Sequence, residues 1–466
     1  MKPSNLRLYV TPEDYQVFAG PDWPAYDDFL QGDRSGIPEI QQEIETMIAM
    51  KKKDGIKFPI STKTACQSKW TWSTIYLNYT SSASCHRVGP VNFELDEFDN
   101  FHNLPKKLDD RRLMLKGEWP TGGCEYCKVI EDAGGWSDRH HNLEIRDLTP
   151  PELETDPTAI VVTPRIVEIF AQNTCNLQCT YCNSHLSSKI EQENRKFGEF
   201  NQGGVVIPVT EVAVTQDEYF KKFIVWLEKN IHTLRRLHLL GGETLIQHEL
   251  MTSVLDVIER NPSPQLQFCI FSNLNVPDKA WNLYIPRIQD LQRRGHIKIF
   301  DLTASIDCWG AEAEYARSGL NLAKFEERFA WAASQDESWL RLNANQTITC
   351  LTMKTMPELI EKLAHYGRNR HIGHYFQFYT GPHMFQHPNI YAYDFWRDTF
   401  DRVFATMPKN TDAQREAVDR MEGMRKYLEV FSENNTEEIT KLHVYLDELD
   451  RRRSTDWRGV FPYLNI

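Results

Sequence analysis

The chain has 466 residues, of which 41% are hydrophobic and 12% aromatic, and its formal net charge is −12. This composition is typical of globular proteins, and the length suffices for two or three domains. The acidic total argues against a large basic surface for nucleic acid. Residues 1–30 lack the apolar core of a signal peptide, and the longest apolar runs are too short to span a membrane. We therefore expect a cytoplasmic protein that binds neither membranes nor nucleic acid.

Four regions follow one another along the chain. Residues 1–60 are a predicted N-terminal extension with an amphipathic helix over 36–50. Residues 61–160 are rich in cysteine, tryptophan and turn residues, and they show little helical periodicity. Residues 161–382 alternate short apolar strands with helical segments, and residues 383–466 are predicted to be largely helical.

The third region determines the expected topology. Its strand candidates are Ile166–Ala171, Leu237–Leu240, Leu266–Ser272, Ile297–Ser305, Leu342–Cys350 and His374–Tyr379. Helical patterns lie between them, and strand–helix alternation indicates parallel strands with right-handed crossovers. Six such units are too few for a closed eight-stranded barrel, so we expect an α/β fold, a partial (β/α)6 TIM-like barrel. In barrels of this kind the chemistry lies at the carboxyl ends of the strands.

Ten cysteines in a chain without an export signal are expected to be reduced thiols. Cys175, Cys179 and Cys182 follow directly after the first strand of the third region. Three thiolates so close in a loop can hold one face of a cubane [4Fe-4S] cluster and leave one iron open. The alternative is a structural zinc site, for which His185 is a candidate fourth ligand.

The CxxxCxxC spacing after this strand, with Asn176, Leu177 and Tyr181 among the residues within it, resembles the radical S-adenosylmethionine (SAM) superfamily. The resemblance implies that the open iron binds the amino and carboxylate groups of SAM. An electron, supplied by a donor such as flavodoxin or ferredoxin, then cleaves SAM to a 5′-deoxyadenosyl radical that takes a hydrogen atom from the substrate. The same resemblance makes Tyr181 a predicted cofactor-binding residue.

Further predicted cofactor-binding residues follow the next strands. Gly241, Gly242 and Glu243 come after the second strand, where this superfamily has a Gly-Gly-Glu that meets the SAM amino group. The glycines allow a close backbone approach, and a carboxylate pairs with an ammonium. By the same resemblance Ser272 and Asn273, Ser305 and Asp307, and Arg317 are candidate SAM contacts. Their alternative roles are turn formation, helix capping and surface charge, respectively.

A second cysteine set, Cys66, Cys85, Cys124 and Cys127, precedes the predicted barrel. The sequence around Cys124-Glu-Tyr-Cys127 resembles the twitch (short SPASM-like) module of radical SAM proteins of bacteria and phages. In those proteins the module carries an auxiliary [4Fe-4S] cluster. That group often has a Cys-Cys pair where this chain has Cys85-His86, so the chain departs from the group's ligand pattern at this position. The alternative is a structural zinc ion held by the four thiolates.

Three cysteines remain in or just beyond predicted strands. Cys269 and Cys350 are expected to be small core residues. Cys308 follows Asp307 at the active-site end of a strand, so it is our candidate catalytic residue, as a hydrogen-atom donor to a substrate radical; the alternative is simple packing.

The combined expectation is a radical SAM enzyme, of oxidoreductase or related type. Its parts are the N-terminal extension, a twitch/SPASM-like module over 61–160, the barrel over 161–382 and a helical C-terminal region over 383–466. The resemblance favours a peptide or protein side chain as substrate, altered by epimerisation, cross-linking or oxidation. Two alternatives stay open: a nucleotide, sugar or other small metabolite as substrate, and a non-catalytic metal-binding scaffold.

Overall fold

The computed structural model describes residues 59–60, 62–132, 137, 139, 148–215, 217–381 and 383–464. The helix predicted over 36–50 lies outside these ranges. The chain divides into two compact units. Within the described residues, the first unit contains those up to 169 together with 217–237, and the second contains 170–215 and the residues from 238 onwards.

The first unit contains a small antiparallel meander and several helices. Strand β1 pairs with β2, and β2 pairs with β3. The strands are β1 (Trp72–Tyr76), β2 (Ser81–Ala83) and β3 (Val91–Asn92), and the helices are α4 (Gln67–Thr71), α5 (Pro105–Leu115), α6 (Glu125–Asp132), α8 (Pro151–Thr155) and α10 (Asp217–Asn230). Aromatic side chains form part of its core, because Phe101 contacts Trp226 and Phe93 contacts both Phe98 and Tyr219.

The second unit is built on a parallel sheet, which confirms the predicted strand–helix alternation. Its strands run in the order β13-β12-β10-β9, and each neighbouring pair is parallel. Their bounds are β9 (Gln267–Ser272), β10 (Ile299–Ser305), β12 (Leu340–Ile348) and β13 (Ile372–Phe378). Leu302 of β10 stands opposite Ile270 of β9 and Leu342 of β12. Two further predicted strands are present as β4 (Ile166–Phe170) and β8 (Arg236–Leu240), each at a point where the chain passes between the units.

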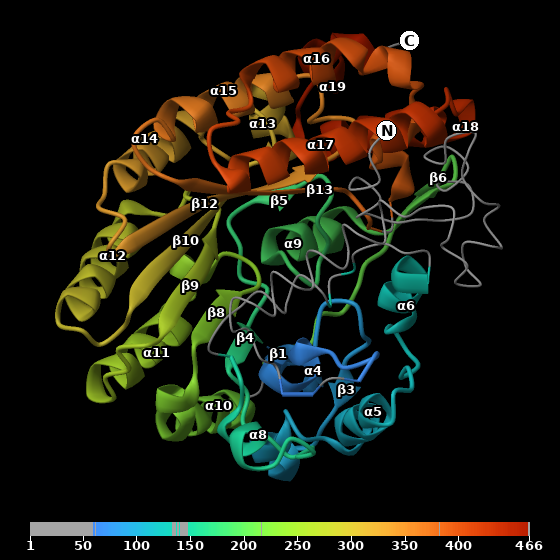
Figure 1. Ribbon diagram of the computed structural model, residues 1–466. Helices are drawn as coiled ribbons and strands as arrows, with labels where there is room; N and C mark the ends of the chain where they lie inside the picture. Colours follow the sequence, from blue (N-terminus) through green and yellow to red (C-terminus); the bar gives the residue numbers. More distant parts are fainter. Residues whose placement is uncertain are drawn as a thin grey trace. The chain divides into compact units, whose positions relative to one another are not determined.

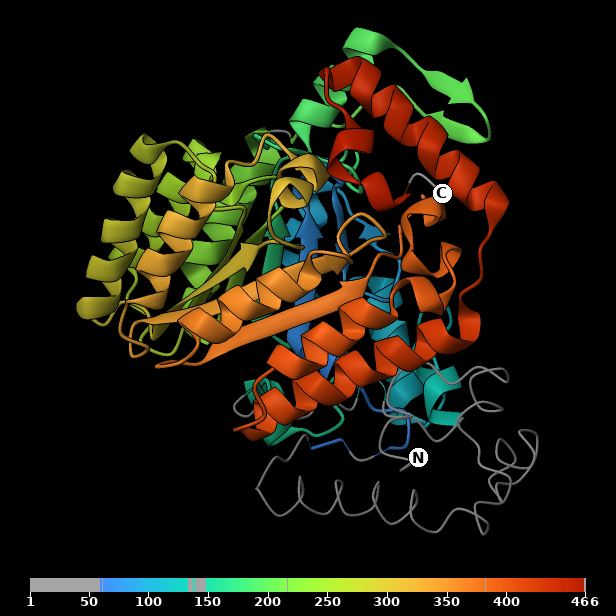
Figure 2. The same cartoon turned by 90° about the horizontal axis from the view of Figure 1, so that it is seen from above.

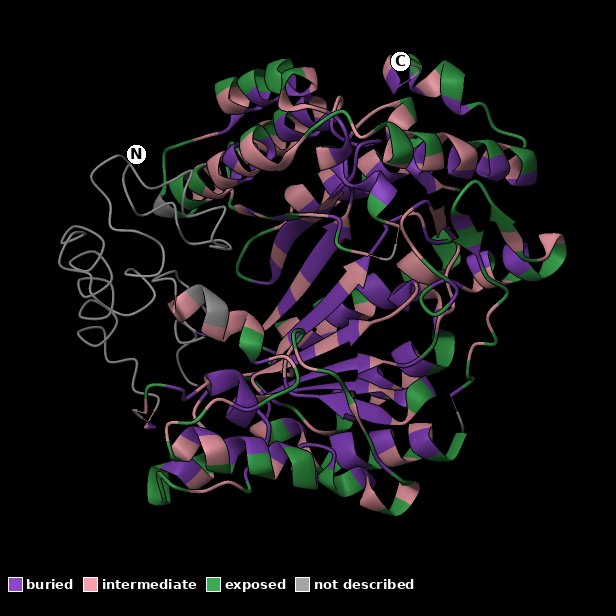
Figure 3. Cartoon of the chain, turned by 90° about the vertical axis from the view of Figure 1, so that its right-hand side faces the viewer, coloured by how far each residue is buried: buried purple, intermediate pink, exposed green. Residues whose placement is uncertain are grey.

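Helices lie between these strands along the sequence. They are α9 (Ser188–Phe197), α11 (His248–Arg260), α12 (Asp278–Arg293), α13 (Ala311–Ala316), α14 (Leu322–Ala333) and α15 (Met356–Tyr366). Four further helices follow β13: α16 (Arg397–Thr406), α17 (Asp412–Phe431), α18 (Thr436–Arg453) and α19 (Trp457–Val460). Helices α11, α12, α14 and α15 lie along one side of the sheet (Figure 1). The strands are largely buried, whereas the helices expose their outer faces (Figure 3). Helix α11 buries Met251, Val254, Leu255 and Ile258, the face that 3.6-residue periodicity predicts.

The C-terminal helices belong to the same unit as this sheet. A hairpin of β6 (Phe200–Gln202) and β7 (Val205–Ile207) lies beside α18 (Figure 2). Gly203 at its turn has a φ of +57°, and a Cβ there would stand 2.9 Å from the Val444 side chain, so this close approach requires glycine. No helix in the described ranges combines the length and apolarity that a membrane crossing requires.

Candidate active site

The loop that carries Cys175, Cys179 and Cys182 connects β4 to α9, and all three cysteines lie in the second unit. Within the loop, the two-residue strand β5 (Gln178–Cys179) pairs antiparallel with β11 (Arg317–Ser318), so Arg317 stands opposite Cys179. The Thr180 N–H donates to the carbonyl of Ala316 at 2.8 Å. The middle of the cysteine loop is therefore fixed to the segment that follows α13.

The three thiols are half-buried and lie close together. Burial raises the pKa of the Cys175 and Cys182 thiols to about 12, and neighbouring thiols of the loop add to both shifts. The Leu177 N–H points at the Cys175 sulfur, with a distance of 3.5 Å between nitrogen and sulfur. In the described ranges no three His, Cys, Asp or Glu side chains are arranged around the position of a single metal ion. A cubane cluster has its ligands on different iron atoms, and neighbouring half-buried thiols with a backbone donor fit such a cluster.

The Gly-Gly-Glu turn after β8 packs directly on the residue that precedes Cys175. The Glu243 N–H donates to the Thr174 carbonyl at 2.8 Å. Gly242 has a φ of +57°, and a Cβ at this position would stand 2.2 Å from the Thr174 carbonyl oxygen. Glycine is thus required both by the backbone conformation and by the contact. The structure brings the two motifs together although about 65 residues separate them.

The Glu243 carboxylate is buried, with an exposed fraction of 1%, and is held in one orientation. It accepts hydrogen bonds from Ser272 Oγ at 2.9 Å, from the Asn273 N–H at 2.7 Å and from the Leu245 N–H at 3.2 Å. Burial nevertheless raises the pKa of Glu243 to about 7, because these bonds only partly offset the loss of water. A cationic group placed beside this carboxylate would favour its charged form, as the ammonium of SAM would.

Asn176 links the cysteine loop to the end of β9. Its side-chain oxygen accepts from Asn273 Nδ2 at 3.0 Å, and its own Nδ2 donates to the Asn275 carbonyl at 3.0 Å. Asn273 thus connects the Glu243 carboxylate on one side with the cysteine loop on the other.

Asp307 and Arg317 form a buried ion pair with exposed side-chain fractions of 1% and 7%. Arg317 Nε and Nη2 donate to the two Asp307 oxygens at 2.8 and 3.1 Å. The Tyr181 hydroxyl, from within the CxxxCxxC motif, donates to the same carboxylate at 2.7 Å. The structure therefore joins three of the predicted cofactor-binding residues to one another.

Other predicted residues are less closely tied to the cysteine loop. Ser305 is the last residue of β10, in register with Asn345 of β12. Cys308 is fully buried beside Thr355, and its role as a hydrogen-atom donor remains a prediction. Cys269 and Cys350 are buried, as expected for core residues.

The four cysteines of the first unit also come together. Burial, with a smaller contribution from the nearby Cys85, raises the pKa of the Cys66 and Cys124 thiols to about 11. Cys127 adds to the shift at Cys124. Cys85, which is far from the other cysteines in sequence, thus lies near both Cys66 and Cys124, as a shared cluster requires.

The surroundings of these four thiols are apolar and include two cations. Trp70 is fully buried in the same hydrophobic cluster as Cys124, and Trp119 packs against that cluster. Lys69, which pairs with Asp110 at 2.6 Å, lies near Cys124, and Arg139 lies near Cys66. Positive charge beside several thiolates offsets their mutual repulsion.

His86 occupies the position at which the twitch group often has a second cysteine. Its ring meets the Trp72 ring edge-on at a centroid distance of 5.3 Å, and its Nε2 lies 3.7 Å from a Glu168 oxygen. The structure thus gives His86 partners of its own beside Cys85.

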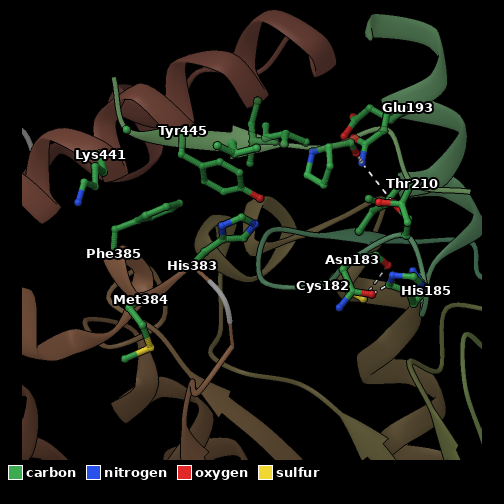
Figure 4. Close-up of a pocket in the computed structure, with 18 of the residues that line it drawn as sticks. Cys182, Asn183, His185, Glu193, Thr210, His383, Met384, Phe385, Lys441 and Tyr445 are labelled. Carbon is green, nitrogen blue, oxygen red and sulfur yellow. Dashed lines mark hydrogen bonds between the residues drawn. The ribbon is translucent and has the colours of Figure 1, made fainter. Parts of the chain in front are cut away.

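A cavity of about 690 Å³ lies next to the cysteine loop, within the second unit. It is lined by α9, the segment from β7 to Thr210, the turn at His383–Phe385, and α18 (Figure 4). Cys182 and Asn183 form part of its wall, and Tyr445 and His383 lie on another side (Figure 4). Helix α9 and the β6–β7 hairpin therefore both contribute to this wall.

The residues that bind the cysteine loop from the C-terminal region were missed by sequence reasoning. Tyr445, Gln386 and Arg453 all donate hydrogen bonds to backbone carbonyls of this loop. They lie more than 200 positions downstream, and no spacing pattern relates them to the cysteines. The arginine run at 451–453 is the one local signal that could have suggested an anchoring role.

Gly242→Ala is expected to destabilise the protein and reduce iron uptake far more than Gly295→Ala. Both glycines have positive φ, +57° and +74°, so each alanine costs about 1 kcal/mol of backbone strain. At Gly242 the new methyl group also collides with the Thr174 carbonyl, whereas at Gly295 it meets no described atom within 4 Å. Thermal melting and bound iron after anaerobic reconstitution measure the difference, and equal effects of the two substitutions would contradict this account of the turn.

Comparisons with known proteins give two solved structures of SuiB from Streptococcus suis. The one bound to precursor peptide SuiA has a TM-score of 0.36 and 10% identity, with 76% of this chain and 70% of that chain covered. The one bound to S-adenosylmethionine has a TM-score of 0.34 and 10% identity, with coverage of 71% and 68%. TM-scores this low do not establish a shared fold. No family model matches the chain, and no curated protein sequence matches it.

Proposed function

We propose that this chain is a radical SAM enzyme whose Cys175, Cys179 and Cys182 hold a [4Fe-4S] cluster. The observation that carries the proposal is the joining of two distant motifs through Thr174. The carbonyl of Thr174, the residue before Cys175, accepts a hydrogen bond from the Glu243 N–H. Only glycine fits at position 242, because a Cβ there would collide with the same carbonyl. When bound, the cluster supplies the electron that cleaves SAM to methionine and the radical that takes hydrogen from the substrate.

In this proposal the protein binds and orients SAM. Glu243, fixed by Ser272 and Asn273, presents a buried carboxylate to the ammonium group of SAM. Arg317 donates to Asp307 through Nε and Nη2. We propose that its third nitrogen, Nη1, donates to the SAM carboxylate. Burial of these charges strengthens their interactions with the cofactor and excludes water from the reaction. The fold that presents them is proposed to be the partial (β/α)6 barrel.

We further propose a peptide or protein side chain as substrate and an auxiliary [4Fe-4S] cluster at the four cysteines of the first unit. The convergence of Cys66, Cys85, Cys124 and Cys127 supports a shared site. A small-metabolite substrate and a structural zinc ion at these thiols are the respective alternatives. A short precursor-peptide gene beside the gene for this chain would favour the peptide, and a nucleotide-modification or biosynthetic cluster would favour the metabolite.

The experiment that tests the proposal is a SAM-cleavage assay. The protein, reconstituted anaerobically with iron and sulfide and reduced with dithionite, should convert SAM to 5′-deoxyadenosine and methionine even without substrate. Glu243→Gln should bind a normal amount of iron but form the product at least about tenfold more slowly, because the carboxylate that pairs with the ammonium is lost. Iron-loaded protein that forms no 5′-deoxyadenosine would instead support the non-catalytic scaffold.

The affinity for SAM is expected to fall as the pH is lowered from 7.5 to 6. Because the pKa of Glu243 in the folded protein is raised to about 7, this carboxylate is mostly charged at pH 7.5 and mostly protonated at pH 6. Binding through an ammonium group requires the charged form, so the dissociation constant should rise roughly eightfold over this range. Equilibrium binding of SAM to the reconstituted protein measures it. Glu243→Gln should remove most of this pH dependence, and a wild type with constant affinity would contradict the role of Glu243.

A further inference from the structure

The C-terminal helix α18 reaches the cysteine loop and binds its backbone. The Tyr445 hydroxyl donates to the carbonyl of Thr180, which lies between Cys179 and Cys182, at 2.6 Å. Gln386 Nε2 donates to the same carbonyl at 3.2 Å. Arg453 Nη1 donates to the Gln178 carbonyl at 3.0 Å. Three side chains thus bind the cysteine loop at two backbone carbonyls, those of Gln178 and Thr180.

These contacts lie inside the protein and one of them is reinforced by charge. Tyr445 is 5% exposed and Gln386 is fully buried. Arg453 binds both oxygens of Glu193 on α9 at 2.9 Å, and the side chains of this pair are 7% and 5% exposed. Glu193 also accepts from Gln178 Nε2 at 3.0 Å. Bidentate, buried pairs of this kind fix geometry more strongly than exposed hydrogen bonds do.

Helix α18 is itself held in place, so it can act as a fixed support. Its Leu442 and Leu446 side chains are fully buried in the hydrophobic cluster of the C-terminal region. Asp450 accepts from the Tyr315 hydroxyl at 2.8 Å, and Arg452 donates to Asn194 of α9 at 3.0 Å. Because packing and hydrogen bonds anchor the helix along its length, movement of Tyr445 or Arg453 away from the loop would be opposed.

We infer that Tyr445 and Arg453 are positioning residues that hold the cysteine loop in the geometry the catalytic cluster needs. The inference rests on the proposed function. Three thiolates bind three irons of one cluster, so a shift between Cys179 and Cys182 changes the cluster environment even when no ligand is lost. Outer-shell partners of metal ligands commonly control activity and reduction potential in this way. The C-terminal region is thereby part of the catalytic unit rather than an appendage.

The test compares Tyr445→Phe with Tyr391→Phe in the full-length reconstituted protein. Tyr391 is also buried, and its hydroxyl has no hydrogen-bond partner among the described residues, so this variant removes a hydroxyl without touching the loop. The measurements are bound iron, thermal melting temperature, midpoint potential and electron paramagnetic resonance (EPR) spectrum of the catalytic cluster, and the rate of 5′-deoxyadenosine formation.

Tyr445→Phe should bind as much iron as Tyr391→Phe and melt at a similar temperature. Its midpoint potential and EPR spectrum should nevertheless be shifted, and it should cleave SAM about tenfold more slowly. Arg453→Met should likewise shift the potential and spectrum and slow SAM cleavage, and it should also melt at a lower temperature because Glu193 loses its buried partner. Arg453→Lys should recover part of the rate. Equal potentials, spectra and rates for Tyr445→Phe and Tyr391→Phe would overturn the inference. If the wild type binds iron but does not cleave SAM, the proposed function fails, and the potential and spectrum alone decide whether Tyr445 positions the loop.

Discussion

Replacing Cys175, Cys179 and Cys182 together by alanine should lower the bound iron from about eight to about four atoms per chain. The three thiols lie together in one loop of the second unit, and the other four candidate ligands lie in the first. Loss of one set should therefore empty one cluster and leave the other intact. Formation of 5′-deoxyadenosine should fall below detection, because the site that binds SAM is gone. Iron, acid-labile sulfide and zinc analyses after anaerobic reconstitution measure the result.

The matched control replaces Cys66, Cys85, Cys124 and Cys127. This variant should retain about four irons and cleave SAM. If the wild type holds about four irons and about one zinc, and the triple variant retains only zinc, the site in the first unit is structural. If the triple variant keeps all of its iron, the assignment of the catalytic cluster to these three cysteines is wrong.

Arg317→Met is expected to be the most destabilising single substitution in the second unit among those discussed. It leaves the buried Asp307 carboxylate without its bidentate partner, since both Asp307 oxygens accept from Arg317. Breaking a buried pair by removing one member costs about 3–5 kcal/mol, because the remaining charge is uncompensated. Tyr181 and Thr347 still donate to Asp307, which places the cost toward the lower end of that range. Urea denaturation gives the free energy of unfolding.

Arg397→Met provides the comparison at the surface. Arg397 pairs with Asp394, but the two side chains are 58% and 77% exposed, so solvent screens the pair. Its loss should change the free energy of unfolding by less than about 1 kcal/mol. A similar small effect for Arg317→Met would mean that the buried pair does not support the site.

Periodicity was sufficient to predict the strands and helices of the parallel sheet. The six strand candidates coincide with β4, β8, β9, β10, β12 and β13 to within about two residues at each end. They could be found because buried strands are short apolar runs between amphipathic helices. The hairpin β6–β7 was not predicted, because Val205–Ile207 is too short to give a periodic signal. Its position on α18 follows from the glycine contact with Val444, which is a tertiary feature.

The sequence predicts which residues belong to the candidate site, but not which of them are hydrogen-bonded to one another. The cysteine spacing and the Gly-Gly-Glu identify the participants, and the topology places strand ends together. That Asp307 pairs with Arg317, and that Tyr181 joins them, depends on side-chain orientations that no spacing encodes. His387 lies between two short 3-10 helices and is only 4% exposed, packed against the Phe378 and Tyr427 rings, which its loop position in the sequence does not indicate.

The most direct test of the catalytic cluster is the EPR spectrum of the reduced protein with and without SAM. The variant lacking Cys66, Cys85, Cys124 and Cys127 is the protein to use, because Cys175, Cys179 and Cys182 are then the remaining cluster ligands. A [4Fe-4S] cluster with one open iron should give a signal whose g values change when SAM is added. An iron-loaded variant with a signal unaffected by SAM, or one that binds zinc in place of iron, would contradict the assignment of these three cysteines to a SAM-binding cluster.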